Sequence, residues 1–268
     1  MRVSLVQLGI NDNRRSEETV GYVVDIVDKI EDAELVVLPE IWNVGFFAFD
    51  YYRKKAETLD GPLVSTFRRK AREKSVHIHT GSFVEKREEG FFNTSVLIGP
   101  AGDLLAVYRK MHLFGFESSE NNVLTPGTGI TVVSTELGRF GLATCYDLRF
   151  PEQFRLMMKQ GVQVFLITSA WPAPRIAHWN LLTKARALEN LCFTVACNCA
   201  GTNRGNELGG NSVIVNPLGD IVASLDKEPG VLSCKVDLGE VSKARAKYPF
   251  VDDMVELDGN NIRIGAGI

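Results

Sequence analysis

Three residues that could together perform acyl-transfer chemistry each follow an apolar run in this sequence. They are Glu40, Lys110 and Cys145, and the runs before them span residues 35–39, 104–109 and 140–144. Short apolar runs of this kind predict buried strands. In layered α/β proteins, reactive side chains collect where strands end. A thiol can attack a carbonyl, a carboxylate can move the proton, and an ammonium can stabilise the developing oxyanion.

The surroundings of Cys145 favour a nucleophile, although a free cysteine is more often a small buried hydrophobe. Polar and charged residues follow it, and Pro151 is typical of the first turn of a helix. Backbone N–H groups converge at a strand-to-helix turn on whatever is bound to the sulfur. The ammonium of Lys110 and the N-terminus of this helix would both favour the thiolate. Taken alone, Lys110 could be a solvated lysine, and Glu40 could be an acid at a helix N-terminus.

The bulk composition excludes several classes of protein. The formal charge of -3 gives no basic surface for nucleic acid, and no stretch approaches eighteen uninterrupted apolar residues, so we expect no membrane span. The N-terminus has no signal-peptide layout, and five cysteines without a Cys-x-x-Cys pair fit the reducing cytoplasm. The pairs Cys197/Cys199 and His77/His79 lack further ligands at a metal-site spacing, so we expect no metal and no cofactor.

Helical and strand patterns alternate along the chain without a linker, so residues 1–268 are predicted to form one domain. Strands are predicted at 3–7, 35–39, 76–84, 92–98, 104–109, 162–168, 192–198, 212–216, 221–223 and 231–236. Helices are predicted at 17–31, 62–74, 151–160, 176–191 and 241–247. Residues 114–129 and the glycine-rich segment 201–210 are predicted loops. Because βα alternation and hairpins both occur, the pattern predicts an α/β protein with a mixed sheet or two sheets.

Three motifs, in this order, resemble those of the nitrilase superfamily of carbon–nitrogen hydrolases, whose members use a Glu–Lys–Cys triad. They are the segments 34–40, 104–115 and 138–152, and the resemblance runs from the first strand to about residue 250. It implies a four-layer α-β-β-α sandwich, with two sheets packed face to face and helices outside each. It also implies subunit pairing through helices near the nucleophile and through the C-terminal segment. We therefore expect a homodimer or higher homo-oligomer, with the tail 248–268 in subunit contacts.

The resemblance further implies a second active-site glutamate in the loop after the lysine. Glu120 stands at the matching distance before Pro126-Gly127, and Glu117 is the alternative. Its implied role is to position Lys110 and the substrate amide. The backbone N–H of Tyr146 would join the lysine in holding the oxyanion.

The residues after the cysteine narrow the range of substrates that the resemblance implies. True nitrilases typically continue with Trp-Glu, whereas the segment 145–152 resembles the amidase branches. The segment 171–179 is most similar to that of bacterial ω-amidases, which cleave the terminal amide of short dicarboxylic monoamides such as 2-oxoglutaramate. Such a substrate carries a carboxylate, which Arg149 or Arg175 could bind. Arg149 could instead pair with Asp147 or Glu152.

Large aromatic side chains could form the wall of the pocket, although such residues more often just pack in the core. The candidates are Trp42, Phe116, Tyr146 and Trp171. His112 and His178 are predicted to be structural hydrogen-bonding residues.

The sequence thus predicts a thiol amidohydrolase that releases ammonia from a small ω-amide through a thioester at Cys145. Its expected partner is a small-molecule amide, with no nucleic acid and no membrane. A deaminated-glutathione amidase and an N-carbamoyl amino acid hydrolase remain open alternatives. A catalytically idle scaffold of the same fold is the non-enzyme alternative, and the presence of Glu40, Lys110 and Cys145 together argues against it.

Overall fold

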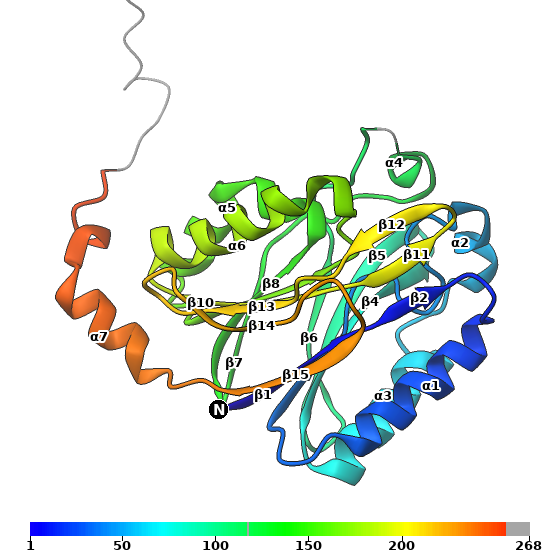
Figure 1. Cartoon of the computed structure of the whole chain (residues 1–268), viewed down its shortest axis with the longest axis horizontal. Helices are drawn as coiled ribbons and strands as arrows, with labels where there is room; N and C mark the ends of the chain where they lie inside the picture. Colours follow the sequence, from blue (N-terminus) through cyan, green and yellow to red (C-terminus); the bar gives the residue numbers. More distant parts are fainter. Residues whose placement is uncertain (117, 256–268) are drawn as a thin grey trace, which may run out of the picture.

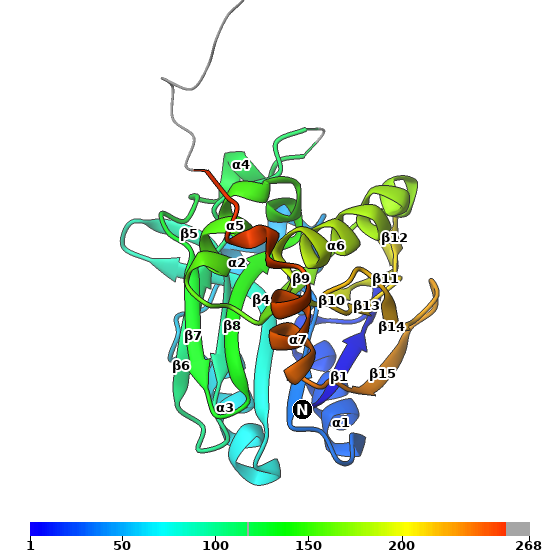
Figure 2. The same cartoon turned by 90° about the vertical axis from the view of Figure 1, so that its left-hand side faces the viewer.

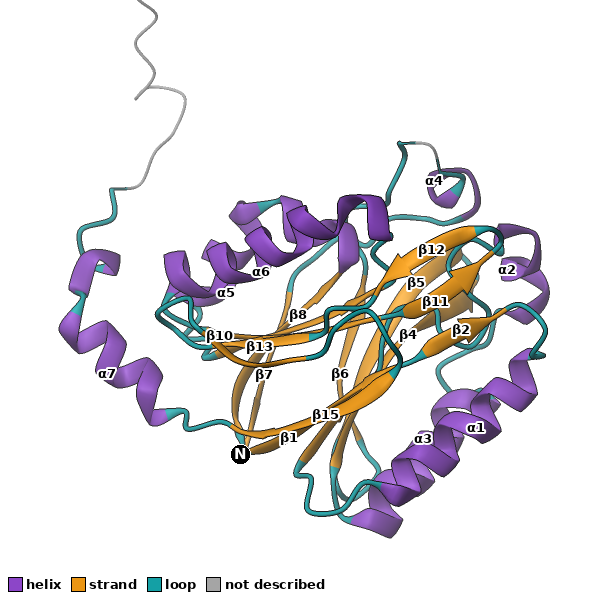
Figure 3. Ribbon diagram, viewed as in Figure 1, coloured by secondary structure: helices purple, strands orange, loops and turns teal. Residues whose placement is uncertain are grey.

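The computed structural model describes residues 1–116 and 118–255, and two six-stranded sheets packed face to face form its centre (Figures 1 and 3). In spatial order, the first sheet contains β15 (Gly230–Lys235), β1 (Arg2–Gln7), β3 (Leu35–Val37), β4 (His77–Arg87), β5 (Gly90–Ile98) and β6 (Leu104–Arg109). The second contains β14 (Ile221–Ser224), β13 (Val213–Val215), β10 (Phe193–Asn198), β9 (Val164–Ser169), β8 (Gly138–Thr144) and β7 (Thr131–Thr135). Each sheet is parallel at its centre and antiparallel towards its edges.

Helices cover the outer face of each sheet. Helices α1 (Ser16–Lys29) and α3 (Pro62–Lys74) lie on the first sheet, and α5 (Pro151–Lys159) and α6 (Ile176–Asn190) lie on the second (Figure 1). The layers are thus helix, sheet, sheet and helix, so the four-layer sandwich implied by the resemblance is confirmed. No helix of the described residues is long and apolar enough to cross a membrane.

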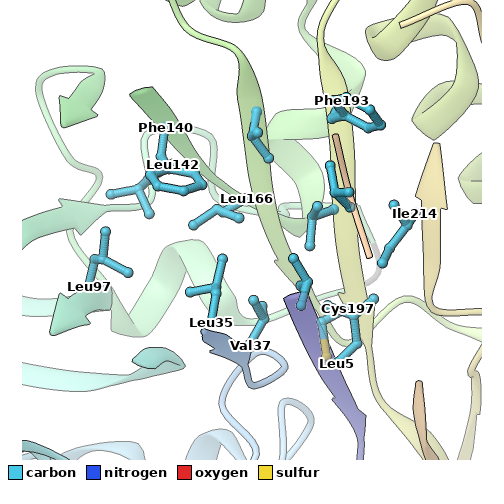
Figure 4. Close-up of a cluster of buried hydrophobic side chains, with 14 of the residues drawn as sticks. Leu5, Leu35, Val37, Leu97, Phe140, Leu142, Leu166, Phe193, Cys197 and Ile214 are labelled. Carbon is cyan, nitrogen blue, oxygen red and sulfur yellow. The ribbon is translucent and has the colours of Figure 1, made fainter. Parts of the chain in front are cut away.

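The main core lies between the two sheets (Figure 4). Leu35 and Val37 of β3 face Leu166 of β9 and Phe193 of β10 there, and all four are buried. The neighbouring side chain of β3, Val36, points the other way into the core beneath α1 and α3. A strand buried on both faces gains from apolar residues at every position, which explains why the run 35–39 shows no alternation.

The structure corrects two expectations about local structure. The segment 201–210 is a hairpin rather than a loop, because β11 (Ala200–Asn203) and β12 (Asn206–Gly209) pair antiparallel and add to β2 (Gly9–Asn11). Arg204 and Gly205, at its tip, both have positive φ, which is the backbone of the tight turns that close hairpins. Helix α2 (Phe49–Lys55) was not expected.

Two further helices complete the described chain. The short α4 (Glu120–Val123) lies inside the predicted loop 114–129, and α7 (Gly239–Lys247) lies at one end of the molecule, at the left of Figure 1 and facing the viewer in Figure 2. Of the predicted tail, residues 249–251 form one 3-10 turn, and the part from 256 onward lies outside the described residues.

Sheet geometry brings the ends of the central strands together. Thr144 and Thr168 are register partners in the parallel pair β8–β9, so Cys145 and Ser169 leave the sheet side by side. The N–H of Glu40 reaches across to the carbonyl of Ser169 at 3.3 Å. Gly81 allows β4 to approach closely here, because a Cβ at this position would lie 1.9 Å from the carbonyl oxygen of Pro39.

Candidate active site

A buried cluster of two carboxylates, one ammonium and one thiol lies at these strand ends. Nζ of Lys110 is 2.9 Å from Oε1 of Glu40, and it is 3.0 and 2.9 Å from the two carboxylate oxygens of Glu120. The side chains of all three residues are 0% exposed. Cys145 is also buried, and the charge of Glu40 acts on its thiol. The structure therefore brings together the four residues that the sequence predicts to be catalytic.

The backbone positions the thiol at a strained point of the chain. Cys145 has φ 48°, a left-handed conformation that costs free energy for any residue with a Cβ. It opens a 3-10 turn, η1 (Cys145–Arg149), whereas α5 begins only at Pro151. The predicted helix from Pro151 is therefore present as α5, and one 3-10 turn separates it from the sulfur.

Asp147 ties this turn to the strand that carries the lysine. Its Oδ2 accepts hydrogen bonds from the Tyr108 hydroxyl at 2.6 Å and from the N–H of Thr144 at 2.9 Å. Its Oδ1 accepts the N–H of His112 at 3.0 Å and lies 2.8 Å from Nδ1 of that ring. Because Tyr108 and His112 flank Lys110 in the sequence, one buried carboxylate fixes the lysine segment against the cysteine turn.

Electrostatics in this cluster favour a protonated thiol. Burial raises the pKa of Cys145 well above its usual value, the charge of Glu40 raises it further, and Lys110 only partly opposes them. Lys110 acts in the expected direction, because its charge lowers the pKa of the thiol, but burial and the charge of Glu40 outweigh it. Burial by itself would lower the pKa of Lys110, but the charges of Glu120 and Glu40 raise it, so the amine is an ammonium. A base must take the thiol proton as the sulfur attacks.

A narrow pocket of about 20 Å³ opens over the thiol, which is room for about one water molecule. Its lining combines apolar and aromatic side chains with two arginines: Phe46, Phe47, Phe114, Cys145, Tyr146, Arg149, Ala170, Trp171, Pro172 and Arg175.

The two arginines of the pocket lie against aromatic rings. The guanidinium of Arg149 is 5.0 Å from the ring centre of Trp171, and one of its nitrogens is 3.1 Å from Nδ1 of His178. The guanidinium of Arg175 is 5.2 Å from the ring centre of Phe114. Neither arginine forms an ion pair with a carboxylate of residues 1–116 or 118–255. The alternative pairing of Arg149 with Asp147 or Glu152 therefore does not form.

Comparison with known proteins places this site in a family. Residues 2–246 match the family described as Carbon-nitrogen hydrolase. The chain belongs to the carbon–nitrogen hydrolase family. Its predicted membership of the nitrilase superfamily, in the amidase branch, is confirmed. As a carbon–nitrogen hydrolase it is an amidohydrolase acting on bonds other than peptide bonds.

Individual relatives match over almost their whole length. A 2-oxoglutaramate amidase of Paenarthrobacter nicotinovorans is 38% identical over 94% of this chain and 88% of the relative. A 2-oxoglutaramate amidase of Bacillus subtilis is 33% identical over 94% of this chain and 96% of the relative. Among solved structures, a carbon–nitrogen hydrolase superfamily protein of Xanthomonas campestris, with an arsenic adduct in its active site, superposes with a TM-score of 0.88. The two chains are 28% identical, and the match covers 96% of this chain and 98% of the other.

The structure shows which of the predicted pocket residues line the pocket of this carbon–nitrogen hydrolase. Tyr146 and Trp171 line the pocket, as expected. Phe116 is 63% exposed and lies outside it, and Phe114, two residues earlier, occupies the wall instead. Trp42 packs against Phe67 beneath the first sheet and is a core residue. The alternative glutamate, Glu117, lies outside the described residues.

Sequence reasoning missed Asn93, which contacts both glutamates of the cluster. A signal was present in the sequence, because Asn93-Thr94-Ser95 is a polar run inside the predicted strand 92–98, which the structure shows to be buried from Asn93 onward. A polar side chain that is buried must find a hydrogen-bonding partner, and here the partners are the charged groups of the site.

Proposed function

We propose that this carbon–nitrogen hydrolase is an ω-amidase that hydrolyses the terminal amide of a small dicarboxylic monoamide, such as 2-oxoglutaramate, to the acid and ammonia. One observation carries the proposal: a buried Glu40–Lys110–Glu120 cluster lies beside the Cys145 thiol, at the end of a narrow pocket with two arginines free of carboxylate partners among the described residues. The naming of two relatives as 2-oxoglutaramate amidases supports the same substrate.

In the proposed first half-reaction, Sγ of Cys145 attacks the amide carbon as Glu40 takes the thiol proton. The ammonium of Lys110 and the N–H of Tyr146 stabilise the oxyanion. The tetrahedral intermediate collapses when the C–N bond breaks, and Glu40 delivers its proton to the departing nitrogen. Ammonia leaves, and the acyl group remains on the sulfur as a thioester.

In the second half-reaction, Glu40 takes a proton from a water molecule that attacks the thioester carbon. The new tetrahedral intermediate collapses with cleavage of the C–S bond, and Glu40 returns the proton to the sulfur. The role of Glu120 is to hold Lys110, since it accepts from Nζ through both oxygens.

The arginines would bind the far carboxylate of the substrate, with Arg175 as the principal ligand. Arg149 already contacts Trp171 and His178. Among the described residues, the guanidinium of Arg175 contacts only the face of Phe114. Deaminated glutathione and N-carbamoyl amino acids also fit this chemistry and are the remaining alternatives.

We also propose that the protein is a homodimer or higher homo-oligomer. Helices α5 and α6 expose Leu156, Leu181 and Leu188, with 53%, 68% and 49% of each residue accessible. Large apolar side chains exposed on the two outer helices of one sheet favour a covered surface. Light scattering of the wild type and of Leu181→Lys tests this, because a monomeric wild type would contradict it. All five cysteines are free, which supports the cytoplasm as the compartment.

Ammonia release tests the function directly. We expect fast release from 2-oxoglutaramate and slow release from propionamide and from a simple aliphatic nitrile. Comparable release from propionamide would retain the thiol mechanism but remove the carboxylate-binding role of the arginines. Release from an N-carbamoyl amino acid alone would establish that alternative, and no release from any of these would favour the idle scaffold.

A further inference from the structure

The side-chain amide of Asn93 on β5 binds both glutamates of the site. Its Nδ2 is 2.9 Å from Oε1 of Glu40 and 3.0 Å from Oε1 of Glu120. An amide has two N–H hydrogens, so these contacts use its whole donor capacity. The reversed amide would point its oxygen at two carboxylates, so the contacts also fix its orientation. Its backbone carbonyl accepts the N–H of Lys110 at 2.9 Å, and one residue thus holds three charged groups.

The contacts of Glu40 leave one of its two oxygens available for a proton. Oε1 accepts from Asn93 and from Lys110, which occupies both of its lone pairs. Oε2 accepts the N–H of Ala170 at 2.8 Å, so its second lone pair is left open among its contacts with described residues. A proton taken from the thiol therefore finds its place on Oε2.

The contacts of Glu120 leave no comparable position. Both oxygens accept from Lys110, Oε1 also accepts from Asn93, and Oε2 also accepts the N–H of Phe114 at 2.7 Å. Burial and the charge of Glu40 raise the pKa of Glu120 above its usual value, although Lys110 opposes them, and the hydrogen bond from Asn93 acts with Lys110 to lower it. Asn93 thus helps to keep this second carboxylate free of the proton.

We infer that Asn93 is a positioning residue that confines the transferred proton to Oε2 of Glu40, the oxygen that keeps an open lone pair. This inference rests on the proposed covalent mechanism, in which Oε2 gains the proton as the S–C bond forms and returns it to nitrogen as the C–N bond breaks. Without Asn93, Oε1 of Glu40 and Oε1 of Glu120 each gain an open lone pair. The proton then has two further resting places besides Oε2 of Glu40.

The burial of Asn93 supports a role in the site rather than in stability alone. The residue is 1% exposed, and its Oδ1 has no hydrogen-bonding partner among the described residues. An unsatisfied buried acceptor costs free energy. The side chain nevertheless keeps this orientation, in which both of its N–H donors reach the charged groups of the site. Asn190 in α6 offers a matched control. It is equally buried, has an unpartnered Oδ1 within the described chain, and donates to the carbonyl of Arg186 at 2.9 Å, outside the site.

Alkylation of Cys145 by iodoacetamide tests the inference without depending on the identity of the substrate. In this reaction the S–C bond forms, iodide leaves, and the thiol proton must go to a base. Adducts are counted at Cys145 by peptide mass, because Cys234 is also partly exposed. We expect Asn93→Asp to lower the alkylation rate about tenfold near neutral pH and to move its acidic limb to higher pH. We expect Asn190→Asp to leave both unchanged.

Turnover gives the second readout. With whichever amide the wild type hydrolyses, Asn93→Asp should lower kcat about 100-fold with little change in KM, because proton transfer and not binding is impaired. Should Asn93→Asp not fold, Asn93→Ser serves as the second variant. It keeps one O–H donor, so the acidic limb of its alkylation profile should move to higher pH by a smaller amount. A wild-type pH profile in both Asn93 variants, or the same loss in Asn190→Asp, would overturn the inference. Failure of 2-oxoglutaramate as a substrate would instead reject only the proposed function.

Discussion

The hydroxyl of Tyr108 donates a 2.6 Å hydrogen bond to Oδ2 of Asp147, and this bond joins the strand before Lys110 to the turn after Cys145. Tyr108 lies two residues before the lysine, and Asp147 lies two residues after the cysteine. The same hydroxyl also accepts the N–H of Met111 at 3.2 Å. The separation of ammonium and sulfur therefore depends on a group that touches neither.

Replacing Tyr108 by Phe removes this hydroxyl and keeps the ring. We expect the free energy of unfolding to fall by about 1–3 kcal/mol, because a buried carboxylate oxygen loses a donor. We also expect kcat to fall more than KM rises, since Lys110 is less well placed for the oxyanion. Urea unfolding and steady-state kinetics measure the two effects. Tyr22→Phe, at an exposed ring, is the control, and an unchanged kcat in Tyr108→Phe would show that the bond is structural only.

Removing the thiol tests the covalent mechanism. Cys145→Ala should abolish ammonia release and leave thermal unfolding nearly unchanged, because only a small side chain is lost at a buried position. Mass spectrometry of the wild type, quenched with acid during turnover, should detect an acyl adduct on Cys145 that the variant lacks. Residual activity above a few per cent of the wild type would reject a thioester intermediate.

Removing the charge of Glu120 tests its role in holding the lysine. Glu120→Gln keeps the shape but leaves Lys110 with one carboxylate, and we expect kcat to fall about 100-fold. Glu120→Ala should in addition lower the free energy of unfolding by about 3 kcal/mol, because a buried ion pair loses a partner. Glu189→Gln removes a carboxylate from the pair with Arg186, outside the site, and serves as control. Activity near the wild-type level in Glu120→Gln would contradict this role.

The strand ends could be predicted because apolar runs and the polar residues that end them are local features. The placement of Glu40, Lys110 and Cys145 follows from them once parallel strands share an edge. Asn93 could not be assigned in this way, because its partners come from segments 53 and 27 residues away. Its orientation depends on the register of β5 with its neighbours, which the sequence does not state.

The exchange of Phe116 for Phe114 in the pocket wall has a similar origin. The N–H of Phe114 donates to Oε2 of Glu120 at 2.7 Å, and this bond sets the course of the loop. A side-chain contact with a buried glutamate decides which aromatic residue faces inward, and residue type alone does not reveal it. The hairpin 201–210 was missed because glycine and asparagine serve tight turns as well as loops.

Arg175 should distinguish amides that carry a carboxylate from those that do not. Arg175→Ala removes a charged hydrogen-bonding partner, which is worth about 1.5–3 kcal/mol. We therefore expect KM for 2-oxoglutaramate to rise about 10- to 100-fold while KM for propionamide changes little. Arg149→Ala should have the smaller effect, because that guanidinium is engaged with Trp171. Equal changes for both substrates in Arg175→Ala would remove this arginine from the carboxylate site.

His79 should make the fold sensitive to acid. It lies on β4 with 0% exposure, neither ring nitrogen has a hydrogen-bonding partner among the described residues, and burial lowers its pKa from 6.5 to about 3. Below pH 6.5 the unfolded chain binds a proton that the folded chain does not, so this histidine's contribution to stability is complete above that pH. It is lost as the pH falls towards 3, with a slope of at most about 1.4 kcal/mol per pH unit. Urea unfolding of His79→Leu between about pH 7 and pH 4 should show a shallower loss of stability than the wild type. The same replacement at exposed His178 is the control, and parallel curves for the wild type and His79→Leu would show that acid acts on other groups.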